Sequence, residues 1–293
     1  MSRAKPQLDE NGKIQMWVGT STDIQDQKDF AESLENEVRE RTKQLAQNNI
    51  ELEKMNKELQ SFAYISSHDL QEPLRKIQTF ASRITEKEND NLSENGKDLF
   101  KRMQASAARM QSLIEDLLAY SRTHTLERDF KKVNLSSVID LVLSDLKEDI
   151  QQKNAIIETN KIGEVNIIPF QFQQLFYNLI SNSLKFSKPE HLLHIIINST
   201  YNKGSKLDNK KLDNEADYCH ISFTDNGIGF EPQYNEKIFE LFQRLHGRNE
   251  YNGTGIGLAI VKRIVENHNG IITAKSELGK GATFDIYLPL ESE

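Results

Sequence analysis

The sequence has few features of a secreted, membrane-spanning or nucleic-acid-binding protein. Its 293 residues include one cysteine, Cys219, so no disulfide framework can form and a reducing compartment is favoured. No run approaches the roughly 18 apolar residues of a spanning helix, and the first residues lack the apolar centre of a signal peptide. The net charge of -7 argues against nucleic acid, which binds basic surfaces. These absences predict a cytoplasmic chain with no membrane segment and no nucleic-acid partner.

Proline and glycine are absent from residues 25 to 59, which predicts one continuous, highly charged helix. Apolar residues recur every seven positions: Val38, Leu45, Leu52 and Leu59 at one core position, and Leu34, Met55 and Phe62 at the other. The second position also receives Arg41 and Asn48, and polar residues there fix register at a cost in stability. The pattern predicts a parallel dimeric coiled coil, and a solvated single helix is the alternative.

A second helix is expected after the polar stretch 88 to 91, with Ser93 as its N-cap. Its apolar stripe is interrupted once, by a serine, and runs Leu99, Met103, Ser106, Met110, Leu113, Leu117, Tyr120. Two antiparallel helices cannot close a core alone, so two copies are expected to form a four-helix bundle. His68 and Asp69, followed by Pro73, would lie on the bundle's outer face. An imidazole beside a carboxylate is a possible nucleophile with an orienting base, and a plain solvated histidine is the alternative.

Residues 7 to 24 contain an Asn-Gly turn followed by a strand through Trp17 and Val18. One strand buries no core, so this segment is interpreted as the end of an upstream domain, or else as a disordered start.

From Phe130 onward the pattern indicates mixed helices and strands. Helices are expected near 136–152, 170–184 and 256–267, and strands near 155–158, 194–200, 218–225, 271–275 and 283–288. The order predicts an α/β sandwich with helices on one face of a sheet. Residues 202–216, which repeat Lys-Leu-Asp-Asn, are interpreted as a solvated insertion.

Two polar motifs of this second part have residue types that suit a nucleotide. In the helix near 170–184, Asn178, Asn182 and Lys185 share one face, and Phe186 follows. Amide oxygens can ligate Mg²⁺, a lysine can neutralise phosphate, and an aromatic ring can lie against a base; a buried polar patch is the alternative. In the second motif, Asp225 ends an apolar strand and can accept the hydrogen of an exocyclic amine.

Glycines and one arginine complete the set. Gly227 and Gly229 follow Asp225 and allow close approach of a ligand, although Asp-Asn-Gly is also an ordinary turn. Arg244 ends the motif Ile238-Phe239-Glu240-Leu241-Phe242-Gln243-Arg244 and could reach a terminal phosphate. The loop Gly253-Thr254-Gly255-Ile256-Gly257-Leu258 opens directly into a helix, whose N-terminus suits phosphate. It follows no strand, so it fails the context required for a dinucleotide fold.

These four motifs, in this order, resemble the N, G1, F and G2 boxes of the sensor histidine kinases. Residues 61–75 resemble their H box, and residues 7–24 resemble the closing strand of a PAS sensor domain. The resemblance implies an all-α dimerisation hairpin followed by an α/β ATP-binding domain of the GHKL type. It divides the chain into a PAS-like remnant (1–24), a coiled-coil signalling helix (25–60), a dimerisation and phosphotransfer domain (61–127) and a catalytic domain (128–293).

In that family ATP phosphorylates a histidine, which passes the phosphoryl group to an aspartate of a response regulator receiver domain. The implied roles are: His68, nucleophile; Asp69, orienting base; Asn182 with Asn178, Mg²⁺ ligands; Lys185 and Arg244, phosphate binding; Phe186, base contact; Asp225, adenine recognition; Gly227 and Gly229, base pocket; and Gly253, Thr254, Gly255, Gly257 and Leu258, phosphate loop. The implied partners are a second copy of the chain, the receiver domain and an upstream sensor domain in the same chain. Phosphorylation within a subunit and between subunits both fit the sequence.

Two other functions fit the same ATP-binding fold. A hydrolysing ATPase or chaperone of this fold would need a glutamate one turn before Asn182, where this chain has Asn178. An inactive ATP-binding adaptor is disfavoured by the intact Asp69, Asn182 and glycine loop. Many relatives have threonine or asparagine four residues after the histidine to position water, and Glu72 stands there instead. We therefore expect weak phosphatase activity.

Overall fold

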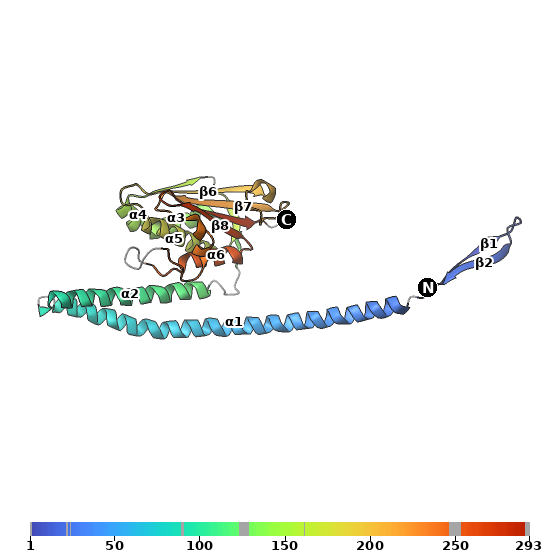
Figure 1. The fold of residues 1–293 in the computed structure, drawn as a ribbon, viewed down its shortest axis with the longest axis horizontal. Helices are drawn as coiled ribbons and strands as arrows, with labels where there is room; N and C mark the ends of the chain where they lie inside the picture. The colour runs from blue at the N-terminus through green and yellow to red at the C-terminus, as the bar shows by residue number, and fades with distance from the viewer. Residues whose placement is uncertain are drawn as a thin grey trace. The chain divides into compact units, whose positions relative to one another are not determined.

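The structure is a computed structural model that describes residues 2–21, 23, 25–88, 91–122, 129–160, 162–245 and 253–290. The chain divides into two compact units, residues 1–61 and 62–293. Figure 1 shows the ribbon of the chain with its elements labelled. Among the helices described, none combines the length and apolar character needed to cross a membrane.

The first unit begins with an antiparallel hairpin of β1 (Ser2–Leu8) and β2 (Ile14–Ser21). The expected strand through Trp17 is confirmed, whereas β1 was not anticipated. The turn contains Gly12 at a φ of 79°. Trp17 remains 63% exposed, and a two-stranded hairpin is marginal by itself. Its origin as the end of a PAS-like domain therefore stays a prediction.

Helix α1 (Gln25–Lys87) starts in the first unit and is continuous through residues 25 to 59, as expected. It also continues through Pro73, much further than the repeat alone indicated. Val38, Leu45 and Leu52 are all more than half exposed along it. The side chains of Leu59 and Phe62 lie outside the described part. Pairing with a second helix in a coiled coil would cover these exposed apolar residues. The coiled coil stays a prediction.

The second unit opens with a helical hairpin made by the end of α1 and by α2 (Glu94–Arg122). Ser93 caps α2, because its hydroxyl oxygen accepts the N–H of Gly96 at 3.2 Å. The hairpin packs through a small apolar cluster of Leu74, Ala107 and Ile114 with Leu118 beside it. The expected stripe is largely left open: Leu99, Met103, Met110 and Leu117 are each at least 40% exposed. The helical hairpin is confirmed, and its outer apolar face is free for a second copy.

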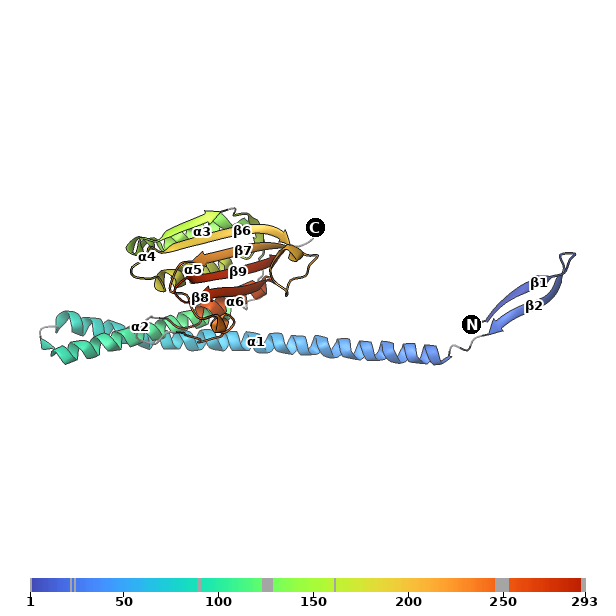
Figure 2. The same ribbon diagram turned by 45° about the horizontal axis from the view of Figure 1, so that its top comes forward.

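An α/β sandwich follows, as expected. Its elements are β3 (Lys131–Asn134), α3 (Leu135–Asp145), α4 (Lys147–Lys153), β4 (Ile156–Asn160), β5 (Glu164–Ile167), α5 (Pro169–Lys185), β6 (His194–Lys203), β7 (Asp217–Asp225), α6 (Gly257–Asn267), β8 (Ile271–Glu277) and β9 (Gly281–Pro289). The main sheet has the order β4-β6-β7-β9-β8, with β4 and β6 parallel and the other pairs antiparallel. Figure 2 shows α5 and α6 behind this sheet. The short strands β3 and β5 pair with each other and were not anticipated.

Two expectations about this domain were wrong in detail. The helix expected over 136–152 is divided at Leu146, whose side chain is buried at the turn between α3 and α4. The insertion 202–216 is not wholly solvated, because Leu212 is buried against Tyr218 and Tyr287. Both features depend on packing partners distant in sequence, which local periodicity does not report.

The core lies between the sheet and helices α3, α5 and α6. Alternate residues of β7, including Ile221 and Phe223, point into it, as the two-residue period of a strand requires. A buried histidine joins the two helices that carry the polar motifs. The N–H of Ile168, at the start of α5, donates to His268 Nε2 at 3.0 Å, and His268 Nδ1 lies 2.7 Å from the carbonyl oxygen of Ile264 in α6. Nε2 is thus the acceptor and Nδ1 carries the proton.

Truncation of Phe172 tests this core. Its ring is fully buried and stacks edge-on against Phe176 and His268, whereas Phe170, on the same helix, is 53% exposed. Phe172→Ala should lower the free energy of unfolding by about 3–5 kcal/mol through lost burial and a cavity. Phe170→Ala should change it far less. Urea denaturation of both variants of the full chain measures the difference, and equal losses would contradict the packing described.

Candidate functional site

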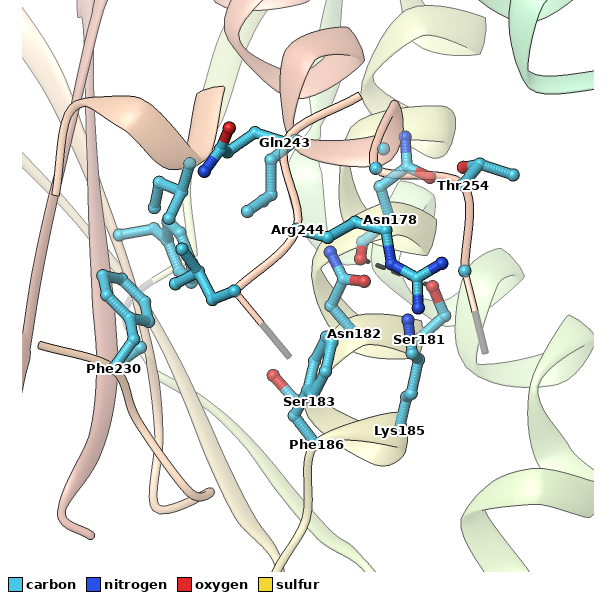
Figure 3. Close-up of a pocket in the computed structure, with 18 of the residues that line it drawn as sticks. Asn178, Ser181, Asn182, Ser183, Lys185, Phe186, Phe230, Gln243, Arg244 and Thr254 are labelled. Carbon is cyan, nitrogen blue, oxygen red and sulfur yellow. Dashed lines mark hydrogen bonds between the residues drawn. The ribbon is translucent and has the colours of Figure 1, made fainter. Parts of the chain in front are cut away.

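The four polar motifs of the sandwich domain meet around one cavity of about 320 Å³, within the range of small-ligand sites (Figure 3). The expected residues that line it are Asn178, Asn182, Lys185, Phe186, Asp225, Gly229, Arg244, Gly253, Thr254, Gly255, Gly257 and Leu258. Gly227 is absent from the lining and lies behind Asp225, where its N–H donates to Oδ1 of that carboxylate at 2.8 Å. Segments far apart in sequence are therefore brought to one site.

The carboxylate of Asp225 is held from three elements at the end of β7. Oδ1 accepts the N–H of Gly227 and, at 3.3 Å, the N–H of Ala282 in β9. Oδ2 accepts the hydroxyl of Ser183 in α5 at 2.9 Å. Burial raises the pKa of Asp225, and these three donors oppose that rise. The fixed carboxylate is therefore a directed acceptor on the cavity wall.

Apolar side chains also line the cavity. Ile228, Phe230, Ile238 and Phe284 all line it, together with Phe186. Such a lining suits a flat heteroaromatic ring, which would bury its faces and present one polar edge.

A cationic region lies elsewhere in the same cavity. In Figure 3, Lys185 and Arg244 lie on the opposite side of Asn182 from Phe230. Burial, with the like charge of Arg244, lowers the pKa of Lys185 to about 8, while Asp116 acts in the other direction. The Lys185 ammonium is also 4.4 Å from the Phe186 ring centre. Two partly buried cations side by side suit a polyanion.

The amides of Asn178 and Asn182 also line the cavity. Asn178 is only 7% exposed, and its Oδ1 is 3.5 Å from Gln174 Nε2. Among the described residues, its Nδ2 has no hydrogen-bond partner. A buried, unpaired amide facing a cationic cavity fits an oxyanion or the oxygen shell of a bound cation. No group of three or more histidine, cysteine or carboxylate side chains that could hold a metal occurs in the described residues. A metal here would rest on amide oxygens and on its substrate.

Two glycines are required by the backbone around the cavity. Gly229 has a φ of 63°, and a side chain there would collide with the carbonyl oxygen of Glu277. Gly255 has a φ of 78° and lies against the backbone of Phe242 and Gln243. Only glycine combines positive φ with such close approach at low cost, which explains both residues.

Helix α2 also contributes to the cavity, which the sequence did not indicate. Ser112 and Asp116 line it, and the hydroxyl of Thr254 donates to the Asp116 carboxylate. Burial raises the pKa of Asp116, against the effect of this hydrogen bond. Helix α2 of the helical hairpin thus contacts the glycine loop directly.

Comparisons with known proteins agree with this arrangement. Residues 168–292 match the model of histidine kinase-, DNA gyrase B- and HSP90-like ATPases, and residues 58–126 match that of the His Kinase A phospho-acceptor domain. The chain belongs to the sensor histidine kinases.

Individual relatives support the same assignment. Phytochrome-like protein Cph1 of Synechocystis sp. is 35% identical over 280 residues, which cover 95% of this chain and 35% of that protein. Sensor histidine kinase WalK of Bacillus subtilis is 30% identical over 253 residues, covering 83% of this chain and 38% of WalK. The chain therefore spans about a third of the length of these relatives.

A solved structure shows the same fold. Full-length ShkA in complex with AMPPNP aligns with a TM-score of 0.54 at 21% identity, covering 79% of this chain and 46% of that one. The likeness confirms a helical hairpin followed by a GHKL-type domain, and the ATPase-domain match supports the use of ATP by this histidine kinase.

The segment 61–75, which resembles the H box, lies within α1. His68 belongs to this helix, and its side chain is outside the part of the chain that the structure describes. Asp69 follows it and is exposed. Glu72 is exposed and forms an ion pair with Lys76 at 2.6 Å. Neither Asp69 nor Glu72 is among the residues that line the cavity.

Several residues of the cavity escaped the sequence analysis. Ser183 lines the cavity and was not predicted, although its place next to Asn182 in the helix could have suggested a second polar contact. Phe230 and Gln243 also line it without a predicted role, and each lies next to a predicted residue, Gly229 and Arg244. Ser112, Asp116 and Tyr177 have no local signal, because they reach the cavity only through tertiary packing.

The lowered pKa of Lys185 predicts a pH dependence of nucleotide binding. The ammonium is charged below about pH 8 and neutral above, so ATP affinity should fall as pH rises from 7 to 9. The fall should be about tenfold, the effect of one lost contact to a charged group. Lys185→Arg should flatten the profile, since a guanidinium keeps its charge. Calorimetric titration at constant ionic strength measures this, and parallel profiles for both proteins would contradict it.

Proposed function

We propose that this chain transfers the terminal phosphoryl group of ATP to its own His68, from which an aspartate of a response regulator receiver domain takes it. The observation that supports the proposal is the arrangement of acceptor, apolar and cationic side chains around the cavity. A directed carboxylate, Asp225, and apolar side chains such as Phe230 line the cavity, and two cations, Lys185 and Arg244, lie on the other side of Asn182 from Phe230 (Figure 3). This order matches the amino group, ring and phosphates of ATP.

Different residues of the cavity bind different parts of ATP. Asp225 accepts a hydrogen from the adenine amino group, with Gly227 and Gly229 shaping the backbone around it and Phe186 against the base. Lys185 and Arg244 neutralise phosphate oxygens. Gly253, Thr254, Gly255, Gly257 and Leu258 form the loop over the phosphates, next to the N-terminus of α6. Asn182, assisted by Asn178, would hold Mg²⁺, whose charge would further neutralise the phosphates.

Phosphoryl transfer then needs mainly positioning. A ring nitrogen of His68 attacks the terminal phosphorus, the bond to the bridging oxygen breaks, and ADP leaves. Asp69 orients the ring and receives its proton. In the second step the receiver aspartate attacks the same phosphorus, and the imidazole of His68 is released unchanged.

The same proposal includes the partners and the domain limits. Two copies of residues 61–127 would form a four-helix bundle through the exposed face of α2, and residues 25–60 would pair as a coiled coil. Residues 1–24 would be the end of a PAS-like sensor domain of the same chain, and residues 128–293 the catalytic domain.

Labelled ATP tests the phosphorylation step. The wild-type chain with ATP and Mg²⁺ should acquire an acid-labile, alkali-stable label, and His68→Ala should lose it entirely because the nucleophile is gone. His191→Ala, at an exposed histidine of the catalytic domain, is the matched control and should keep the label. An unlabelled wild type, or equal labelling of His68→Ala, would contradict the proposal.

Glu72 predicts slow removal of phosphate from the regulator. A carboxylate paired with Lys76 is a poor substitute for the amide or hydroxyl that positions water, so the wild type should dephosphorylate a phosphorylated receiver slowly. Glu72→Asn should accelerate this loss without changing autophosphorylation. Time courses of receiver phosphate measure both. Rapid loss with the wild type, unchanged in Glu72→Ala, would show that residue 72 has no such role.

A further inference from the structure

Ser183 makes a hydrogen bond that the binding roles above do not use. Its side chain is 3% exposed, and its hydroxyl oxygen lies 2.9 Å from Asp225 Oδ2 and 3.2 Å from the carbonyl oxygen of Leu179. A hydroxyl has one proton and can donate to only one of these acceptors. A carboxylate is the stronger acceptor, so the proton points to Asp225.

The geometry leaves one direction open on the carboxylate. Oδ1 already accepts the backbone N–H groups of Gly227 and Ala282. Oδ2 accepts only the Ser183 hydroxyl among the bonds described, so its second lone pair is available to the cavity that both residues line. The donors come from α5, β9 and the loop after β7, so they hold the carboxylate plane as well as its position.

We propose that Ser183 is a positioning residue for base selection: its hydroxyl keeps Asp225 Oδ2 an acceptor aimed at the 6-amino group of adenine and so excludes 6-oxo purines. The inference rests on the proposed function, because it assumes that the cavity binds ATP. A 6-oxo purine such as hypoxanthine presents an acceptor where adenine presents a donor. Two acceptors facing each other would leave a buried oxygen unpaired, at a cost comparable to a lost hydrogen bond.

Removal of the Ser183 hydroxyl should also allow Asp225 to bind a 6-oxo purine. Burial raises the pKa of Asp225, and the Ser183 hydrogen bond is one of the interactions that lower it; Lys188 is the charged group that acts in the same direction. Without the hydroxyl the folded-state pKa rises further, and a protonated Oδ2 becomes a donor that can serve a 6-oxo group. The variant should therefore bind ATP less well and discriminate less.

The test compares ATP with inosine triphosphate, in which a 6-oxo group replaces the 6-amino group and N1 carries a hydrogen. Calorimetry on the full chain with Mg²⁺ should show that Ser183→Ala weakens ATP binding by about tenfold, the loss of one hydrogen bond to a charged group. Inosine triphosphate should weaken by a smaller factor, so the ratio of the two affinities falls. The loss for ATP should deepen as pH falls, because Asp225 in the variant takes up a proton at higher pH than in the wild type.

Two variants separate positioning from general structure. Ser187→Ala removes another buried hydroxyl near the end of α5, one that donates to Leu184 and does not line the cavity, and it should leave both affinities unchanged at every pH. Ser183→Thr keeps the hydroxyl and should restore the ATP preference. Thermal midpoints without nucleotide check that all variants fold.

The outcomes distinguish this inference from the proposed function. If the wild type binds no ATP, the proposed function fails. If the wild type binds ATP and Ser183→Ala keeps the same affinity and the same preference for ATP, Ser183 has no positioning role, while the kinase function stands. Equal weakening of both nucleotides by Ser183→Ala would also overturn the inference, because selectivity would then be unaffected.

Discussion

The structure of the catalytic domain depends on hydrogen bonds that stabilise one buried carboxylate. Asp225 closes β7 at the edge of the core, where an uncompensated charge would be strongly destabilising. The chain satisfies it with two backbone N–H groups and one hydroxyl, from the loop after β7, from β9 and from α5. The three elements must therefore meet at this point. The hydrogen bonds to Asp225 that fix the fold at this point also hold its carboxylate as an acceptor facing the cavity.

Helix α5 links that acceptor to the cationic region. Neighbouring positions on this helix face different partners: Ser183 contacts Asp225, while Asn182 and Lys185 project into the cavity, as Figure 3 shows. The start of α5 is tied to α6 through His268, and α6 begins at the glycine loop. Helix α5 and helix α6, which follows the glycine loop, are thus held together by one buried imidazole.

The sequence predicted those features that depend on local pattern. The central helices and strands follow from periodicity, and residue chemistry and motif order indicated that Asp225, Asn182 and the glycine loop belong to one site, whose cavity they line. Features that depend on distant contacts were missed. Ser183 is an unremarkable helical serine until β7 is placed against α5. Asp116 is one of many acidic residues of α2 until it meets Thr254. The break at Leu146 is decided by where its side chain is buried, which no local pattern contains.

The central claim is that this cavity binds ATP with its base at Asp225 and its phosphates toward Asn182 and Lys185. A crystal structure of the chain with Mg²⁺ and a non-hydrolysable ATP analogue tests it most directly. The account predicts the adenine amino group within hydrogen-bond distance of Asp225 Oδ2 and the phosphates beside Lys185 and Arg244. An analogue bound outside this cavity, or one whose base lies away from Asp225, would contradict it.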